Sequence, residues 1–109
     1  NRKIKQKTET VITEEKAPEY IIEFIVQIGV WNNDMNFETQ QNIESIGGVV
    51  KILEKGNLYK YIAGRFSSLS EAEFKKSEVA KSGFSDAFIY AEKDGQRIKV
   101  TEAIRLLNE

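Results

Sequence analysis

The chain has 109 residues, of which 40% are hydrophobic and 30% are charged, and its 16 basic and 17 acidic side chains give a formal net charge of −1 at pH 7. This length predicts one domain with a single modest core, and interspersed charges of both signs do not predict a nucleic-acid interface. The sequence has no cysteine and no histidine, which excludes thiol nucleophiles, disulfides, Cys/His zinc sites and imidazole catalysis, and we expect no cofactor.

The first part of the sequence has the composition of a linker. Residues 1–19 are polar and contain the only proline, at position 18. Such a segment cannot bury enough apolar surface to offset its ordering entropy, so residues 1–19 are predicted to be a flexible linker and residues 20–109 the folded domain. Because the first residue is not methionine, we expect a fragment of a longer protein. No apolar stretch approaches the roughly 20 residues of a membrane-spanning helix, and we expect no membrane contact by this fragment.

The run from Phe24 to Trp31 is predicted to be the central strand, because it is apolar and β-branched and is broken only by Gln27 and Gly29. Period-two alternation predicts that Phe24, Val26, Ile28 and Val30 face helices, and that Ile25, Gln27, Gly29 and Trp31 form a mixed outer face. A second run, from Leu58 to Phe66, again has a glycine two residues before an aromatic residue. The chain is therefore predicted to contain two halves of similar plan.

Local signals place the elements between these strands. A helix is predicted from Asn36 to Ser45, ended by the glycine pair at 47–48. A strand from Val49 to Lys55 is joined to the strand at 58–66 by a two-residue turn at Gly56. The predicted order up to this point is strand, helix, strand, strand.

The second half repeats this order and adds an extension. Ser68 and Glu71 have the spacing of a capping box, which predicts a helix of about twelve residues that ends at Gly83. The remaining predicted elements are a strand at 86–91, a turn at 93–96, a short strand at 97–100 and a helix at 101–107. Ile104 and Leu107 are expected to dock this last helix on the body of the domain.

The order strand, helix, strand, strand, helix, strand predicts an α+β, ferredoxin-like (RNP-like) βαββαβ fold. This fold has a four-stranded antiparallel sheet with two helices on one face, and here it carries a short C-terminal strand and helix extension from about residue 93. Right-handed crossovers leave the other face of the sheet open to solvent or ligand. We therefore expect function on that open face.

Four segments, in this order and spacing, resemble SPOR (sporulation-related repeat) domains, which are bacterial cell-envelope modules common in cell-division proteins. They are Val26–Trp31, Tyr59–Phe66, Ser70–Ala72 and Gly83–Ile89. The resemblance covers about residues 21–92. It implies a non-catalytic domain that binds peptidoglycan glycan strands stripped of their stem peptides and that targets its parent protein to the periplasm, the cell envelope or the division site.

The resemblance also implies roles for single residues. In the family, the glutamine of the Val-Gln-x-Gly motif contacts the glycan, and here that position is Gln27. An arginine that also contributes is replaced by Lys60, which keeps the charge but loses the planar fork. Many members have a small polar residue where this chain has Val30, and a proline where it has Arg65. These departures bear on the affinity and specificity for the glycan.

Two polar side chains suit a sugar site independently of the resemblance. The amide of Gln27 can both donate hydrogen bonds to sugar hydroxyl groups and accept them. Lys60 has the same strand parity as Ile62, so both are expected on the outer face beside Gln27. The alternative is that Gln27 and Lys60 are solvated strand residues without a binding role.

Glycine and aromatic residues complete the candidate site. Gly29 leaves a flat patch where a sugar ring could approach, or else accommodates a bulge or close packing. Trp31 can stack on a sugar ring or cover the core, and Tyr90 shares one strand face with Phe88, so the two form a stacking platform if that face is open. The candidate ligand-binding residues are Gln27, Gly29, Trp31, Lys60, Ile62 and Tyr90.

Other function classes are less well supported. The acid pairs at 14–15 and 71–73 are not set across an apolar cleft as in glycosidases, so no catalytic residue is predicted. An RNA-binding sheet would need a basic face with surface aromatic residues in signature positions. The alternative that stays open is a ferredoxin-like protein-interaction or dimerisation module that has lost glycan binding, and a weak homodimer is compatible with either function.

Overall fold

The computed structural model describes residues 19–108 of the chain, so the linker predicted for residues 1–19 lies outside the described residues except at its last position. In chain order, the elements are β1 (Ile22–Trp31), α1 (Phe37–Ile46), β2 (Val50–Lys55), β3 (Leu58–Phe66), α2 (Leu69–Lys81), β4 (Phe88–Lys93), β5 (Gln96–Ile98) and α3 (Val100–Leu107). Within the described range, no helix is both long and apolar enough to cross a membrane.

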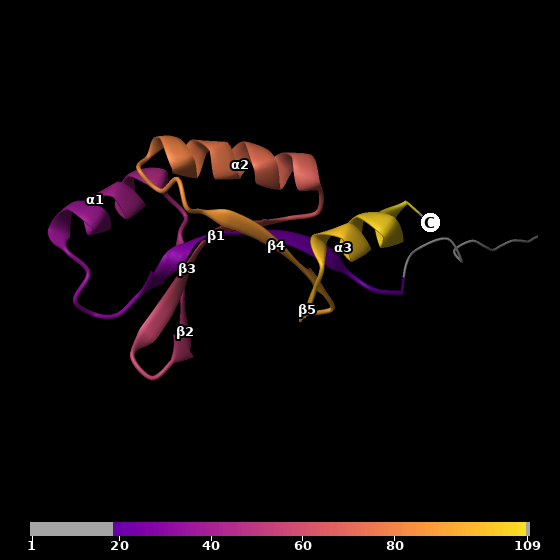
Figure 1. Cartoon of the computed structure of the whole chain (residues 1–109), viewed down its shortest axis with the longest axis horizontal. Coiled ribbons are helices and arrows are strands. Elements are labelled where there is room, and N and C mark those ends of the chain that lie inside the picture. Colours follow the sequence, from indigo (N-terminus) through magenta and orange to yellow (C-terminus); the bar gives the residue numbers. More distant parts are fainter. Residues whose placement is uncertain (1–18, 109) are drawn as a thin grey trace, which may run out of the picture.

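The strands form one antiparallel sheet in the order β2-β3-β1-β4-β5 (Figure 1). The first four strands and the two crossing helices α1 and α2 confirm the predicted α+β, ferredoxin-like arrangement. β5 and α3 form the C-terminal extension, in which β5 adds a fifth strand at the β4 edge of the sheet.

The main core lies between the sheet and its helices. Phe24 and Val26 of β1 are fully buried there against Ala72 of α2 and Ala103 of α3. α1 and α2 lie above the sheet in Figure 1, and side chains of all three helices belong to this core or pack against it. The opposite side of the sheet, which we call the open face, carries no helix of the described chain.

Side-chain caps fix the starts of α1 and α2. The side chain of Asn36 accepts a hydrogen bond of 2.8 Å from the backbone N–H of Thr39, and Ser68 accepts one of 3.3 Å from the backbone N–H of Glu71. Each satisfies a donor that the first turn of a helix leaves unpaired. These local signals therefore fix where α1 and α2 begin.

The docking of α3 differs in one residue from the prediction. Ile104 packs against the core as expected, but Leu107 is 48% exposed, and Leu106 packs in its place. Leu107 lies on the same face of α3 as the fully buried Ala103, but it is the last residue of the helix, beyond the part that packs on the core.

The register between β1 and β3 shifts twice within a few residues. The pairs on either side of the shifts are Val26 with Gly64, Gln27 with Ile62, and Gly29 with Tyr61. Ala63 is thus skipped on β3 and Ile28 is skipped on β1, so two one-residue bulges cancel each other. A bulge reverses the side-chain alternation of its strand, and the period-two prediction for β1 therefore fails after Ile28.

The bulges exchange residues between the two faces. Gly29 and Trp31 were expected on the outer face with Gln27, but Trp31 packs against the helix-side core and Gly29 pairs with a residue of that core. Val30 was expected to face the helices, but it lies on the open face opposite Lys60 and is 43% exposed. The prediction was therefore wrong for Gly29, Val30 and Trp31, because the bulge in β1 moves each of them to the opposite face.

Each bulge is accompanied by a glycine whose missing side chain is replaced by an aromatic ring. A Cβ atom at Gly29 would lie 2.8 Å from Cη2 of Trp31, and a Cβ atom at Gly64 would lie 2.6 Å from Cζ of Phe66. Both distances are well below van der Waals contact, so any larger residue would displace the ring from its packed position. The glycine-x-aromatic pattern of the two halves is therefore a packing requirement.

We expect Gly64→Ala to lower the free energy of unfolding by about 1–3 kcal/mol, because the added methyl group overlaps the Phe66 ring. Urea denaturation measures this loss. In a Phe66→Leu background the same substitution should cost clearly less, since the two residues are coupled. An equal cost in both backgrounds would show that the ring contact is not its cause.

Candidate functional site

One row of residues crosses the open face from strand to strand. Its members are successive cross-strand partners on β2, β3, β1 and β4: Val50, Ile62, Gln27 and Phe88. None of them belongs to the helix-side core, and Ile62 instead forms a second buried cluster with Ile25 and Tyr90. We call this set the cross-strand row.

The centre of the cross-strand row is covered and its ends are exposed. Gln27 is 8% exposed and Ile62 is 2% exposed, whereas Phe88 is 39% exposed and Val50 is 54% exposed. An amide with little solvent contact thus lies between two accessible apolar side chains. Such an arrangement can hold a sugar ring by contact with its apolar C–H face and by hydrogen bonds to its hydroxyl groups.

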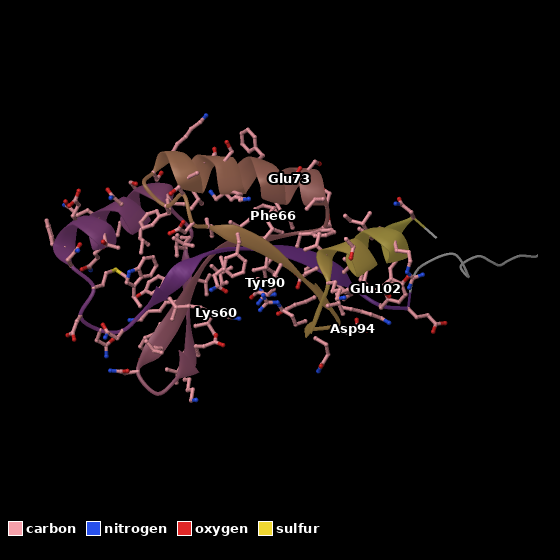
Figure 2. All side chains as sticks on the ribbon, viewed as in Figure 1. Lys60, Phe66, Glu73, Tyr90, Asp94 and Glu102 are labelled. Carbon is pink, nitrogen blue, oxygen red and sulfur yellow. The ribbon has the colours of Figure 1, made fainter. Side chains whose placement is uncertain are left out.

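Tyr90 lies beside the row and is held by two cations. Lys60 Nζ donates a hydrogen bond of 3.0 Å to the Tyr90 hydroxyl group, and the Arg97 guanidinium lies 4.0 Å from the centre of the Tyr90 ring. Figure 2 shows Lys60 and Tyr90 on the side of the sheet away from α2. Because Arg97 covers it, Tyr90 is only 3% exposed, and the accessible ring of the predicted stacking platform is that of Phe88.

Lys60 remains accessible in this arrangement. Its side chain is 19% exposed, and its ammonium group lies 3.8 Å from a carboxylate oxygen of Glu54 on β2. Lys60 therefore presents a donor at the margin of the open face, fixed in position by Tyr90.

Arg65 joins three neighbouring strands at the other end of the open face. Its Nη1 atom lies 3.2 Å from an oxygen of Glu23 on β1 and 3.0 Å from an oxygen of Glu92 on β4. The hydrogen bond that Arg65 donates to Glu92 and the charges of both carboxylates raise the pKa of Arg65 above its usual value. Arg65 thus links neighbouring strands, and its guanidinium is paired with protein carboxylates.

Trp31 belongs to the opposite side of the sheet. Its ring makes edge-to-face contacts with Tyr61 and Phe84, with ring centres 5.4 and 5.9 Å apart. Of the two roles considered for Trp31 and Gly29, the structure fits packing in the core. Neither residue lies on the same face as Gln27.

The structure therefore places Gln27, Lys60, Ile62 and Tyr90 on one face and separates them from Gly29 and Trp31. Sequence reasoning missed Val50 and Arg97 as members of this face. The alternation of Val50 with Ile52 along β2 was an available signal for the first. No local pattern indicated that β5 would lay Arg97 over Tyr90.

Among residues 19–108, no group of three or more acidic side chains is placed to hold a metal ion. The open face combines the apolar side chains of Val50 and Phe88 with the polar groups of Gln27 and Lys60, which can bind a ligand by contact and hydrogen bonding.

Comparison with known proteins gives one informative similarity. No protein-family model and no curated protein matches the chain. Among solved structures, the chain is similar to the peptidoglycan binding domain of the B. subtilis cell wall lytic enzyme CwlC, determined in solution, with 30% sequence identity over 71% of this chain and 98% of that domain and a TM-score of 0.45. This chain is therefore similar in sequence to a peptidoglycan-binding domain along almost the full length of that domain.

We expect Arg65→Gln to lower the free energy of unfolding by about 0.5–1 kcal/mol, because partly exposed ion pairs contribute little individually but here two share one cation. The loss should shrink in 1 M NaCl, which screens exposed charges. Lys76→Gln on α2 removes one positive charge far from these carboxylates and serves as the control. A loss at Arg65 that is unchanged by salt would contradict an ion-pair role.

Proposed function

We propose that this domain is a non-catalytic module that binds peptidoglycan glycan strands, preferably those stripped of their stem peptides, through the open face of its sheet. The observation that carries this proposal is the convergence of Gln27 and Lys60 on a helix-free face. These are the positions whose counterparts contact the glycan in the family that the sequence resembles. Strands β1 and β3 bring them together with the accessible ring of Phe88.

The chemistry of this face fits a sugar chain. The Phe88 ring offers an apolar surface for a pyranose face, Lys60 offers ammonium donors, and the amide of Gln27 can pair with hydroxyl or N-acetyl groups. The face is shallow, and hydrogen bonds to sugars compete with water. We therefore expect modest affinity that adds up along a glycan strand with repeated units.

Of the acids considered for hydrolysis, the pair at 14–15 lies outside the described residues, and Glu71 and Glu73 lie on α2. Glu71 lies in the first turn of α2, where it accepts a hydrogen bond of 3.0 Å from the Ser68 hydroxyl group. Glu73 lies on the same helix, on the side of the sheet away from the open face (Figure 2). The proposal accordingly assigns no hydrolytic step to these acids.

The proposed role follows from the proposed ligand. A glycan-binding module would hold its parent protein at the bacterial envelope, in the periplasm or at the division site, where amidases expose stripped strands. The CwlC domain to which the chain is similar in sequence is a peptidoglycan-binding domain. The proposal itself depends on the residues of the open face.

A sedimentation assay with purified sacculi tests the function. The domain should sediment with peptidoglycan, and a larger fraction should sediment after an amidase has removed the stem peptides. Cellulose and chitin, pelleted in parallel, are the control polymers. Equal sedimentation with all of them would contradict specific binding to peptidoglycan.

Two substitutions test the face. Phe88→Ala and Lys60→Gln should each weaken binding to stripped glycan about three- to tenfold, because each removes one direct contact. Phe74→Ala and Lys81→Gln on α2 are matched controls, since Phe74 is 69% exposed on the helix side. Equal losses in the controls would place the binding surface elsewhere.

Self-association through the same face is the second candidate, because Val50 and Phe88 are accessible apolar side chains on one surface. Size-exclusion chromatography with light scattering distinguishes the two functions. Under the glycan proposal the domain is monomeric or its dimer dissociates on addition of glycan. A stable dimer that Val50→Asp disrupts, and that glycan does not affect, would favour the interaction module.

A further inference from the structure

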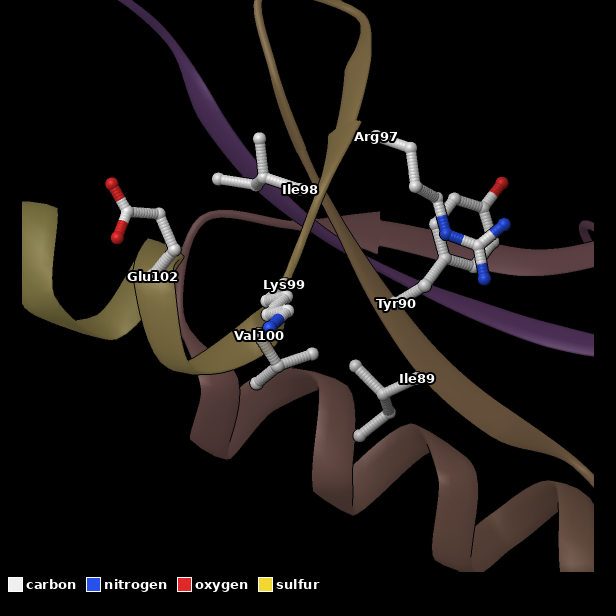
Figure 3. Close-up of a pocket in the computed structure, with 7 residues that line it drawn as sticks. All are labelled: Ile89, Tyr90, Arg97, Ile98, Lys99, Val100 and Glu102. Carbon is white, nitrogen blue, oxygen red and sulfur yellow. The ribbon is translucent and has the colours of Figure 1, made fainter.

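A pocket of about 720 Å³ lies between β4, β5 and the start of α3 (Figure 3). It exists because β5 is short: β5 pairs only with Ala91–Lys93, after which the chain leaves the sheet and enters α3. The first half of β4 pairs with β1 on one side, and its outer edge has no strand beside it in the described chain. The residues that line the pocket are Ile89, Tyr90, Arg97, Ile98, Lys99, Val100 and Glu102.

The charges of the pocket favour an anion at the end near Tyr90. Arg97 and Lys99 are exposed cations, whereas Glu102 lies on α3 at the opposite end from Arg97 in Figure 3. The Glu102 carboxylate is held by Arg105, whose Nη2 atom lies 2.6 Å from it, and this hydrogen bond lowers the pKa of Glu102. The acid of the pocket is thus already balanced by a protein cation.

The rest of the lining is apolar. Ile89 and Val100 approach each other across the pocket in Figure 3, and Ile98 lies on the adjoining strand. A suitable ligand therefore combines an anionic group with a small carbon body, and an inorganic anion would leave this apolar part unfilled.

Tyr90 connects the pocket to the open face. The same side chain lines the pocket, lies under Arg97 and accepts the hydrogen bond from Lys60. A ligand that lies on the open face next to Lys60 therefore needs to extend only past Tyr90 to reach Arg97, and Lys99 lines the same pocket nearer to α3.

We infer that this pocket is a carboxylate-binding subsite, in which Arg97 and Lys99 bind the lactyl carboxylate of a muramic acid residue. The inference rests on the proposed glycan-binding function. A stem peptide is joined to the lactyl group by an amide bond, so its removal leaves a free carboxylate on a small carbon unit. The planar guanidinium of Arg97 can bind such a group with two parallel hydrogen bonds, and the methyl group of the lactyl unit suits the apolar lining.

Isothermal titration of the chain with two matched ligands tests this subsite. One ligand is a stripped muramyl tetrasaccharide with free lactyl carboxylates, and the other is the same tetrasaccharide with these groups converted into neutral methylamides. We expect the free acid to bind about three- to tenfold more tightly, as charge-assisted hydrogen bonds at a partly exposed site allow. This preference should decrease in 0.5 M NaCl.

Removal of the two cations should abolish the preference. In the variant Arg97→Gln/Lys99→Gln, the free acid and the methylamide should bind with equal affinity. Lys99→Gln alone should halve the preference or reduce it further without a loss of fold, because Lys99 is exposed and its side chain makes no cap hydrogen bond to α3. Lys76→Gln/Lys81→Gln on α2 carries the same change in net charge and should keep the full preference.

The outcomes separate the subsite from the glycan proposal. Equal binding of both ligands to the unmodified chain, or an undiminished preference in Arg97→Gln/Lys99→Gln, would overturn the subsite while leaving glycan binding intact. Binding of neither ligand to the unmodified chain would overturn the glycan proposal and the subsite with it.

Discussion

The packing of two aromatic rings over two glycines is the constraint on which the arrangement of this sheet depends. Trp31 occupies the space that a side chain at Gly29 would need, and Phe66 does the same at Gly64. Each glycine adjoins a one-residue bulge between β1 and β3, so the strands can bring both rings into the helix-side core. The bulges thus decide which rings enter the helix-side core, and the open face keeps the rings of Phe88 and Tyr90.

The C-terminal extension then decides how much of the open face a ligand can reach. Arg97 of β5 covers Tyr90, and Arg65 closes the adjacent part of the sheet with two carboxylates. The accessible part includes Val30, Val50, Lys60 and Phe88, together with the pocket beside β5. A ligand is thus expected to follow a narrow track across the strands, and this geometry suits a single extended glycan strand better than a broad macromolecular surface.

Much of the fold could be predicted because its signals are local. Asn36 and Ser68 cap the helices, and the turn at Gly56 joins β2 to β3 where expected. The faces of β1 beyond Ile28 could not be predicted, because simple alternation assumes an unbroken ladder. Bulges are decided by how side chains pack in three dimensions, and nothing adjacent in the sequence specifies that Ile28 should be skipped.

Tertiary packing likewise limited how far the candidate site could be predicted. Gln27 comes before the bulge in β1 and Lys60 comes before the bulge in β3, so simple alternation places both on the same face. Trp31 comes after the bulge in β1, and alternation places it on the wrong face. Arg97 could not be placed, since its contact with Tyr90 depends on how β5 folds back on β4. Residues near the regular part of a strand were therefore predictable, and those positioned by tertiary contacts were not.

The most direct test of the central claim is an NMR chemical-shift titration of the domain with a stripped glycan fragment. The account predicts perturbation of the Gln27 side-chain amide and of backbone amides near Lys60 and Phe88, with α1 and α2 unaffected. Perturbations confined to α1 and α2, or none at saturating glycan, would contradict a sugar-binding open face.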